Sequence, residues 1–334
     1  LLSETPKGVF RTRRFEDHMK NFAFVFPGQG SQAVGMLDAW GDHPEVAHTL
    51  AEASDALGEN LGQLIHEGPK ELLSLTTNTQ PVMLVAGVAA WRVWRSEGGA
   101  IPSVMAGHSL GEYAALVAAG VLTLAQAAPL VRFRAAAMQE AVPVGTGAMA
   151  AILGMDAQRV IAGCAEAQAT FGLGSSEVVE AANFNDPAQT VISGSKAAVD
   201  KACEVLKANG AKRALPLPVS APFHSSLMKP AAVRLKEKLA NTVFAQAQIP
   251  VVNNIDVAVE TDADRIRDAL YRQAFGPVRW VECVQAFKAR GIDTIVECGP
   301  GKVLAGMVKR IDPELTGLAL YDPATLVDVK TSLA

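Results

Sequence analysis

Short apolar runs that end in glycine-containing turns recur along the chain. They begin at residues 22, 103 and 294 and read FAFVFPGQG, SVMAGHSLG and TIVECGPG. Apolar runs of this length, bounded by turn residues, are typical of buried strands. Helical patterns occupy the intervening segments at residues 44–57, at residues 81–94 and from Leu110 onward. Strands that alternate with helices predict an α/β fold with a mainly parallel sheet.

The middle of the chain follows a different order. AMAAIL, EVVEAANFN, AQTVISGS and KRALPLPVS read as strands, and residues 157–168 and 196–209 read as helices between the outer pairs. The resulting order β-α-β-β-α-β predicts a ferredoxin-like subdomain at about residues 146–216. We expect it to be inserted into the α/β domain, which would then comprise residues 19–145 and 217–334.

Composition narrows the class of protein. The 334 residues are 49% hydrophobic and 19% charged, which indicates a globular chain with a sizeable core. The net charge of −4, without a long run of Lys and Arg, argues against a nucleic-acid partner. The four cysteines are scattered and form no C-x-x-C pair, so they predict neither a zinc site nor a disulfide framework. Reduced core thiols in a cytoplasmic protein are the expectation.

Two segments bear on targeting. Residues 113–131 carry no charge, but Gly120 and Pro129 interrupt them and alanine predominates over leucine. They predict two buried helical segments and no membrane span. Residues 1–18 show no clear pattern, and Met19 then opens the first apolar run. We interpret residues 1–18 as an extension that lies outside the domains, and we see no secretory signal.

A serine lies between two glycines directly after one predicted strand. Gly107, Ser109 and Gly111 form the pattern G-x-S-x-G ahead of a helix. This pattern suits a nucleophile on a sharp strand-to-helix turn, where the close approach of neighbouring backbone requires residues without a Cβ. A glycine-flanked turn with a merely solvated serine fits the same pattern. The sequence therefore offers Ser109 as a candidate nucleophile and leaves both interpretations open.

A serine nucleophile needs a base and two oxyanion donors. Of the six histidines, only His224 follows the serine, in the irregular segment PVSAPFHSSLMKP. The adjacent His108 should point away from the serine on the turn. The backbone N–H of Leu110, at the start of a helix, is one candidate donor. The loop PGQGSQ is the candidate source of the second donor.

The same loop has a competing interpretation. Gly28, Gly30 and Ala33 after a strand also fit the dinucleotide fingerprint G-x-G-x-x-G/A. That fingerprint needs a second strand that ends in an acidic residue about twenty positions later. Here a polar helical segment occupies that region. A non-catalytic dinucleotide-binding module therefore remains a weaker hypothesis, which predicts NAD binding and no reactive serine.

Eight motifs together resemble a known family. They are FVFPGQGSQ, GHSLGEYAAL, RFRAAAMQEAVP, ANFNDPAQTVISG, PFHSSLMKP, VVNNIDV, RQAFGPVRW and ECGPGKVL. In this order they resemble the malonyl-CoA:acyl carrier protein transacylases of fatty acid synthesis. The resemblance runs from Met19 to about Tyr321 and is far more specific than any single motif. It implies an α/β-hydrolase-like parallel-sheet domain with an inserted ferredoxin-like subdomain.

The resemblance also implies roles for individual residues. Ser109 would carry the malonyl group, and His224 would act as base and then as acid. A main-chain carbonyl near Gln273 would support the histidine where hydrolases use Asp or Glu. Gln29 and Leu110 would donate their N–H groups to the oxyanion. Arg134 would bind the free carboxylate of malonate. Phe223 would be the bulky side chain that limits α-branched acyl groups.

The implied reaction is ping-pong transfer from malonyl-CoA to the phosphopantetheine thiol of acyl carrier protein, with no metal or redox cofactor. Acyl carrier proteins are usually acidic, so we expect a local basic surface, for which Lys302, Lys309 and Arg310 are candidates. A serine hydrolase with the same turn is the alternative. Its usual order places the histidine near the C-terminus, whereas more than a hundred residues follow His224 here.

Overall fold

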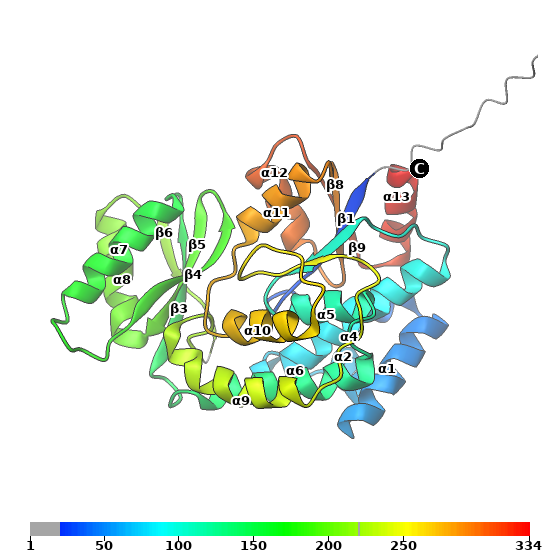
Figure 1. Ribbon diagram of the computed structural model, residues 1–334, viewed down its shortest axis with the longest axis horizontal. Helices are drawn as coiled ribbons and strands as arrows, with labels where there is room; N and C mark the ends of the chain where they lie inside the picture. The colour runs from blue at the N-terminus through cyan, green and yellow to red at the C-terminus, as the bar shows by residue number, and fades with distance from the viewer. Residues whose placement is uncertain (1–20, 220) are drawn as a thin grey trace, which may run out of the picture.

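The computed structural model describes residues 21–219 and 221–334, and it contains two β-sheets (Figure 1). The expectation for residues 1–18 lies outside the described part of the chain. The predicted α/β class with a parallel sheet is confirmed. In Figure 1, strands β3 to β6 with helices α7 and α8 form the left part of the molecule, and the remaining elements form the right part.

The larger sheet is wholly parallel and has the strand order β7-β2-β1-β8-β9. Its strands are β1 (Phe22–Phe26), β2 (Val104–Gly107), β7 (Val251–Val252), β8 (Thr294–Cys298) and β9 (Thr316–Leu320). Strands β1, β2 and β8 are buried along their whole length. Continuous apolar runs suit them because helices cover both faces of the sheet. The three apolar runs that the sequence singled out are therefore its central strands.

Helices cover the two faces of the parallel sheet. Side chains of Phe22, Phe24 and Phe26 pack with one core cluster that includes helix α4, whereas Ala23 and Val25 pack with α11 and α12. The alternation follows from the twofold period of a strand. The helices of this part are α1 (Pro44–Leu57), α2 (Leu61–Glu67), α3 (Lys70–Leu73), α4 (Thr76–Ser96), α5 (Gly111–Ala118), α6 (Leu124–Glu140), α9 (Lys229–Ala240), α10 (Ala263–Gln273), α11 (Trp280–Ala289), α12 (Val303–Ile311) and α13 (Pro323–Leu333).

The helices that the sequence predicted agree with the structure to within one residue, except at α4. The prediction of a helix at 44–57 is confirmed by α1. The prediction at 81–94 was wrong at its start, because α4 begins at Thr76 and carries Pro81 inside the helix. Proline lacks an N–H and normally marks a helix start, so the sequence pattern favoured a later beginning. The buried residues around Pro81 make this first turn part of the core, and tertiary packing outweighs the local preference.

The smaller sheet is antiparallel with the strand order β4-β5-β3-β6. Its strands are β3 (Gly147–Leu153), β4 (Val179–Asp186), β5 (Gln189–Ser195) and β6 (Arg213–Pro216). Helices α7 (Ala157–Ala169) and α8 (Lys196–Ala208) complete the predicted β-α-β-β-α-β order. Both helices pack with this sheet in a separate core cluster. Every element that the sequence predicted in this stretch is present.

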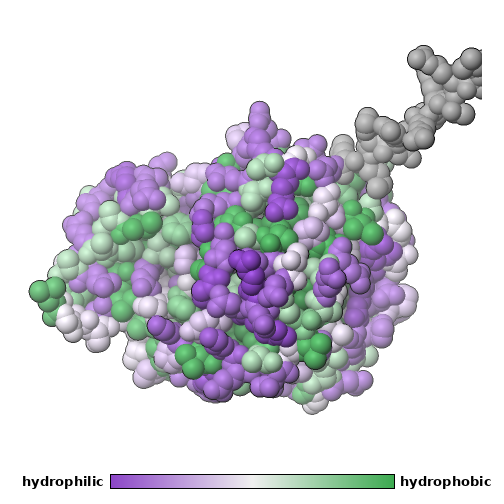
Figure 2. Space-filling view, in the orientation of Figure 1, coloured by the Kyte–Doolittle hydropathy of each residue, from purple (hydrophilic) through white to green (hydrophobic). Residues whose placement is uncertain are grey.

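The uncharged stretch at 113–131 falls into two helices. It spans most of α5 and the first half of α6, and the two helices are separated by a turn at Gly120. Across residues 21–219 and 221–334, none of the helices is long and apolar enough to cross a bilayer. On the face in Figure 2, hydrophilic and hydrophobic residues are intermixed over both parts of the molecule. The four cysteines are free; Cys203 is partly exposed, and the other three are buried.

Candidate active site

Ser109 stands on the predicted turn between β2 and α5. Its φ of 53° lies in the left-handed region, which non-glycine residues seldom adopt. A Cβ on Gly107 would lie 1.8 Å from the carbonyl carbon of Gly111, and one on Gly111 would lie 2.0 Å from the carbonyl oxygen of Phe26. Neither position has room for a side chain. The close backbone approach predicted for the two glycines is confirmed, and the turn presents a half-buried serine.

His224 lies in the irregular segment after β6 and contacts the serine. Its Nε2 is 2.7 Å from Ser109 Oγ. Its Nδ1 is 2.9 Å from the carbonyl oxygen of Gln273 and 3.2 Å from that of Gly276. Carbonyl oxygens only accept hydrogen bonds, so Nδ1 carries the proton and donates to them. Nε2 is therefore the unprotonated nitrogen, and it can accept the proton of the Ser109 hydroxyl.

Burial keeps this imidazole neutral. His224 is 4% exposed, and loss of solvation lowers the pKa of its side chain to about 3, with the positive charge of Arg134 acting in the same direction. The Gln273 and Gly276 carbonyls oppose this shift because they stabilise the protonated ring. Within the described residues, no carboxylate pairs with His224. Main-chain carbonyls thus occupy the position that Asp or Glu takes in most hydrolase triads.

Arg134 projects from α6 into the same buried region. It is 2% exposed, and its Nη2 lies 3.2 Å from Ser109 Oγ. Its other acceptors are neutral amides: Nη1 donates to Gln80 Oε1 at 2.6 Å, and Nη2 donates to Gln273 Oε1 at 3.1 Å. Its Nε has no partner among the described residues. A buried guanidinium with unused donors and without a carboxylate partner is suited to bind a carboxylate.

Arg132 behaves differently from Arg134, as its helix position predicts. Its Nη2 donates to Glu59 Oε2 at 2.6 Å, in a pair whose side chains are 24% and 45% exposed. Arg134, by contrast, is 2% exposed and lies beside Ser109.

The loop after β1 lies against the serine turn. A Cβ on Gly28 would be 2.6 Å from the carbonyl oxygen of His108, so this loop and the turn touch through their backbones. Gln29 follows in that loop, and Leu110 is the N-cap of α5. Within residues 21–219 and 221–334, neither backbone N–H donates a hydrogen bond to the protein. The second strand that a dinucleotide fingerprint requires does not follow, because α1 occupies that region.

The other residues that the sequence singled out differ in burial and in their partners. Phe223, next to His224, is 8% exposed and belongs to the main core cluster. His108 Nε2 is 2.8 Å from Asn185 Oδ1, so this ring is engaged away from the serine hydroxyl. Lys302 and Lys309 are exposed, whereas Arg310 pairs with the buried Asp186 at 2.7 Å.

Three residues that the sequence did not single out complete the site. Gln80 holds Arg134, and Asn254 holds the serine turn: Asn254 Oδ1 accepts from Ser109 N at 2.8 Å, and Nδ2 donates to the Gly107 carbonyl at 2.8 Å. Glu112 is 2% exposed and accepts from both Asn254 and Gln273. A carboxylate in the first turn of an otherwise apolar helix was the signal for Glu112. No comparable signal marked Gln80.

Comparison with known proteins places this geometry in context. The model of the family described as "Acyl transferase domain" matches residues 23–313. The malonyl CoA-acyl carrier protein transacylase of Salmonella typhimurium is 53% identical, over 92% of this chain and 98% of the relative. The transacylase of the same name from Bacillus subtilis is 46% identical, over 92% and 96% of the two chains.

Solved structures are similar along nearly the whole chain. The acyl-carrier-protein S-malonyltransferase of Burkholderia pseudomallei is 62% identical and superposes with a TM-score of 0.90, over 94% of this chain and 100% of that one. A malonyl-transacylase solved in complex with its type II polyketide-synthase acyl carrier protein is 49% identical, with a TM-score of 0.90 and coverage of 94% and 100%.

Proposed function

The chain belongs to the acyl transferase family, among its malonyl CoA-acyl carrier protein transacylases, and on this premise we propose how its residues move a malonyl group in fatty acid biosynthesis. The substrates are malonyl-CoA and acyl carrier protein. The contact between Ser109 Oγ and His224 Nε2 at 2.7 Å is the observation that supports the proposal most strongly.

In the first half-reaction, Ser109 Oγ attacks the thioester carbonyl of malonyl-CoA. The hydroxyl proton passes to His224 Nε2, the C–O bond forms, and the carbonyl oxygen becomes an oxyanion. The N–H groups of Gln29 and Leu110 donate to that oxyanion. The C–S bond then breaks, and the proton on His224 goes to the departing sulfur of CoA. The product is malonyl-Ser109 and free CoA.

The second half-reaction runs the same steps in reverse with a new thiol. The phosphopantetheine thiol of acyl carrier protein gives its proton to His224 and attacks the malonyl ester carbonyl. Collapse of the second oxyanion breaks the C–O bond and returns the proton to Ser109 Oγ. The Gln273 and Gly276 carbonyls stabilise the protonated imidazole in both halves. The cycle is ping-pong and balances without a metal or redox cofactor.

Arg134 provides the specificity for malonyl groups. Its donors near Ser109 Oγ would form paired hydrogen bonds to the free malonate carboxylate. An acetyl group would leave the buried cation without that partner, at a cost of about 2–5 kcal/mol. Phe223 would leave little room for an α-methyl branch. Equal transfer of methylmalonyl and malonyl groups by the unchanged protein would contradict this role of Phe223.

The architecture that we propose is an α/β-hydrolase-like domain formed by residues 19–145 and 217–334, with a ferredoxin-like subdomain at residues 146–216. The β-α-β-β-α-β order and the strand order β4-β5-β3-β6 support the second assignment. Free cysteines support a cytoplasmic location. Of the candidate basic residues for acyl carrier protein, Lys302 and Lys309 remain in the proposal, and Arg310 is less available because it pairs with Asp186.

Intact-mass analysis after mixing with malonyl-CoA tests the proposed nucleophile. The unchanged protein should gain one malonyl group, and peptide mapping should place it on Ser109. Ser109→Ala should abolish the adduct, whereas Ser103→Ala, an exposed serine upstream, should retain it. An adduct on the Ser109→Ala protein would refute the assignment. Comparing hydrolysis with transfer to a thiol separates the transferase from the alternative serine hydrolase, which would release free malonate predominantly.

A further inference from the structure

The carboxylate of Glu112 has no part in the steps above, although it lies within the same network. Glu112 is in the first turn of α5, three residues after Ser109, and is 2% exposed. Its Oε2 accepts from the backbone N–H of Asn254 at 2.9 Å and from Gln273 Nε2 at 2.9 Å. Burying a carboxylate is costly, so its two partners indicate what it does.

The first partner, Asn254, holds the serine turn from both sides. Its side chain accepts from the Ser109 N–H and donates to the Gly107 carbonyl, each at 2.8 Å. Ser109 has a left-handed φ, which is unfavourable for a residue other than glycine and must be maintained by surrounding contacts. The bond from Glu112 fixes the backbone of Asn254, and thereby the position from which its side chain reaches the turn.

The second partner, Gln273, connects to the histidine and to Arg134. Its main-chain carbonyl accepts from His224 Nδ1, and its Oε1 accepts from Arg134 Nη2. Its Nε2 donates to the Ser109 carbonyl at 3.0 Å and to Glu112. Because Glu112 Oε2 can only accept hydrogen bonds here, the Gln273 side-chain amide must turn its Nε2 toward Glu112. This orientation leaves Oε1 facing Arg134.

We propose that Glu112 is a positioning residue for acyl transfer, whose Oε2 holds Asn254 and Gln273 so that Ser109 and His224 stay aligned. The inference rests on the proposed roles of Ser109 and His224. What matters in this role is an acceptor at the correct distance, and negative charge is not required. A proton on the other oxygen, Oε1, would leave Oε2 able to accept both bonds.

The electrostatics of Glu112 are consistent with an acceptor role. Burial raises the pKa of Glu112 to about 7, against the opposing effects of the Asn254 and Gln273 bonds and of the Arg134 charge. Near neutral pH the group is therefore partly protonated. Glutamine at this position would present one acceptor oxygen at the same distance, so it imitates the protonated form.

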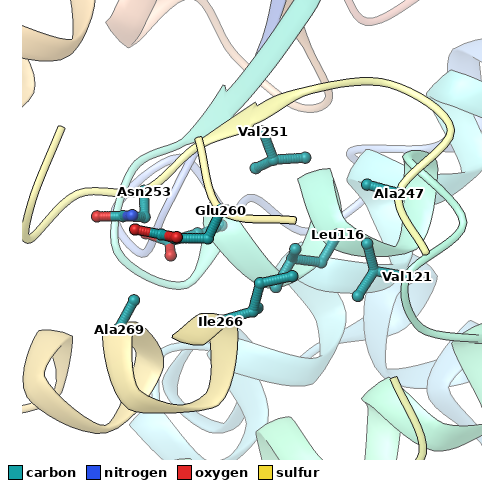
Figure 3. A pocket seen from close by; sticks show the side chains of 9 residues that line it. Leu116, Val121, Ala247, Val251, Asn253, Glu260, Ile266 and Ala269 are labelled. Carbon is teal, nitrogen blue, oxygen red and sulfur yellow. The ribbon is translucent and has the colours of Figure 1, made fainter. Parts of the chain in front are cut away.

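A small cavity beside Glu112 makes side-chain length testable. Its volume is about 10 Å³, close to the space that one water molecule needs, and neither Ser109 nor His224 lines it. Figure 3 shows Asn253 and Glu260 on one side of it, with Val121 and Ile266 among the apolar side chains nearby. The cavity adjoins Glu112, so neighbouring side chains do not fill all the space around it. If aspartate replaced Glu112, its shorter side chain would therefore not be pressed by its neighbours toward Asn254 and Gln273.

The test compares Glu112→Gln with Glu112→Asp. We would measure the single-turnover rate of acylation by malonyl-CoA per protein molecule able to be labelled, with active sites counted by intact mass. Glu112→Gln should stay within about threefold of the unchanged protein. Glu112→Asp keeps the charge but is one methylene shorter, so it should be slower by about 10-fold to 100-fold, in line with a lost hydrogen bond of about 1–3 kcal/mol.

Further measurements separate positioning from a merely structural role. The KM for malonyl-CoA should change little in Glu112→Asp, and reaction with a small sulfonyl fluoride should slow in parallel, since that reagent reports the Ser109–His224 pair alone. Glu297→Gln is the matched control, because Glu297 is also fully buried but accepts from the backbone of α12. It should alter thermal stability and leave the rate per labelled molecule unchanged.

The outcomes are distinguishable. If the unchanged protein gains no malonyl group on Ser109, the proposed function itself fails. If it does, and Glu112→Asp acylates within threefold of it, the positioning role is overturned. A Glu112→Gln protein that is slower than Glu112→Asp would also overturn it, because charge would then outweigh the acceptor position. A rate order with Glu112→Gln well above Glu112→Asp supports the proposal.

Discussion

At the scale of the residue, the two side chains that we propose to react have an unusual backbone conformation. Ser109 has φ of 53° and His224 has φ of 61°, although neither is glycine. Such conformations cost on the order of 1–3 kcal/mol each and persist only where neighbouring contacts hold them. Here Asn254 bonds the serine turn, and two carbonyls bond the imidazole. From these two positions, Oγ and Nε2 lie 2.7 Å apart.

Replacing Arg134 tests how the acyl group is selected. Arg134→Ala should lower kcat/KM for malonyl transfer by about 30-fold or more, because the malonate carboxylate loses a buried ionic partner worth about 2–5 kcal/mol. Acetyl transfer should rise relative to malonyl transfer. Competition between the two CoA thioesters measures this ratio. Arg132→Ala is the control, since that side chain pairs with Glu59. An unchanged preference in Arg134→Ala would show that Arg134 does not face the acyl group.

The pKa of His224 predicts an unusual dependence of rate on pH. Its lowered value of about 3 means that the folded protein keeps the imidazole neutral through pH 6.5, where a free imidazole would be half protonated. We therefore expect kcat/KM to stay flat down to about pH 5 and to decline only at lower pH. In the proposed complex, the carboxylate of the malonyl group would offset the charge of Arg134 and so would raise the pKa of His224.

The acid limb of kcat, which reports the substrate complex, should accordingly lie at higher pH than that of kcat/KM. Rapid mixing from about neutral pH into buffers of lower pH measures both before the protein can unfold. A fall of kcat/KM to one half near pH 6.5 would contradict the burial of His224 as the controlling factor.

At the scale of the element, the strand-turn-helix unit from β2 to α5 depends on two glycines. Gly111→Ala would place a Cβ 2.0 Å from the Phe26 carbonyl oxygen, so the turn or β1 must move. We expect a loss of about 3 kcal/mol or more in the free energy of unfolding, measured by urea denaturation.

Gly306→Ala is the control for that measurement. Gly306 lies within α12, and a Cβ there would meet no atom within 4 Å. Alanine should stabilise this helix by up to about 1 kcal/mol, because it restricts the unfolded chain. If both substitutions changed the free energy of unfolding equally, the turn at Gly111 would be able to accommodate a Cβ at little energetic cost.

At the scale of the whole molecule, a few contacts join the antiparallel sheet to the rest of the molecule close to the site. The Phe184 N–H donates to the Val278 carbonyl at 2.9 Å, His108 Nε2 meets Asn185 Oδ1, and Arg310 pairs with Asp186. All three lie at the end of β4. The antiparallel sheet is therefore held beside the serine turn, where acyl transfer is proposed to occur.

Weakening this junction should cost stability. Asp186→Asn keeps a side-chain oxygen for the Ala188 N–H but removes the charge that Arg310 meets. Because the Asp186 side chain is only 5% exposed, we expect a loss of about 1–2 kcal/mol in the free energy of unfolding. Asp200→Asn, at an exposed helical pair with Lys196, should change it by less than about 0.5 kcal/mol. Equal small losses would indicate that the junction does not depend on this ion pair.

Local signals in the sequence predicted the three central strands and the second sheet, but they did not predict β7 or β9, several helices, or the start of α4. Apolar runs marked β1, β2 and β8 because each is buried along its length, and the order of the middle stretch marked the second sheet. The start of α4 was not predicted, because packing in the core imposes the helical conformation around Pro81. The roles of Gln80 and Asn254 were not predicted, because an uncharged amide side chain forms no distinctive sequence motif.

The sequence by itself determined the strand-turn-helix at Ser109, since only glycine fits where backbones meet, and the alternation of elements that makes a parallel sheet. The tertiary structure alone decided which distant groups meet that serine. His224, Arg134, Asn254 and Gln273 converge from separate elements. Their pairing depends on how helices pack on the sheet, and packing distances do not follow from local periodicity. Burial then sets the protonation of His224, because loss of solvation depends on the whole surrounding fold.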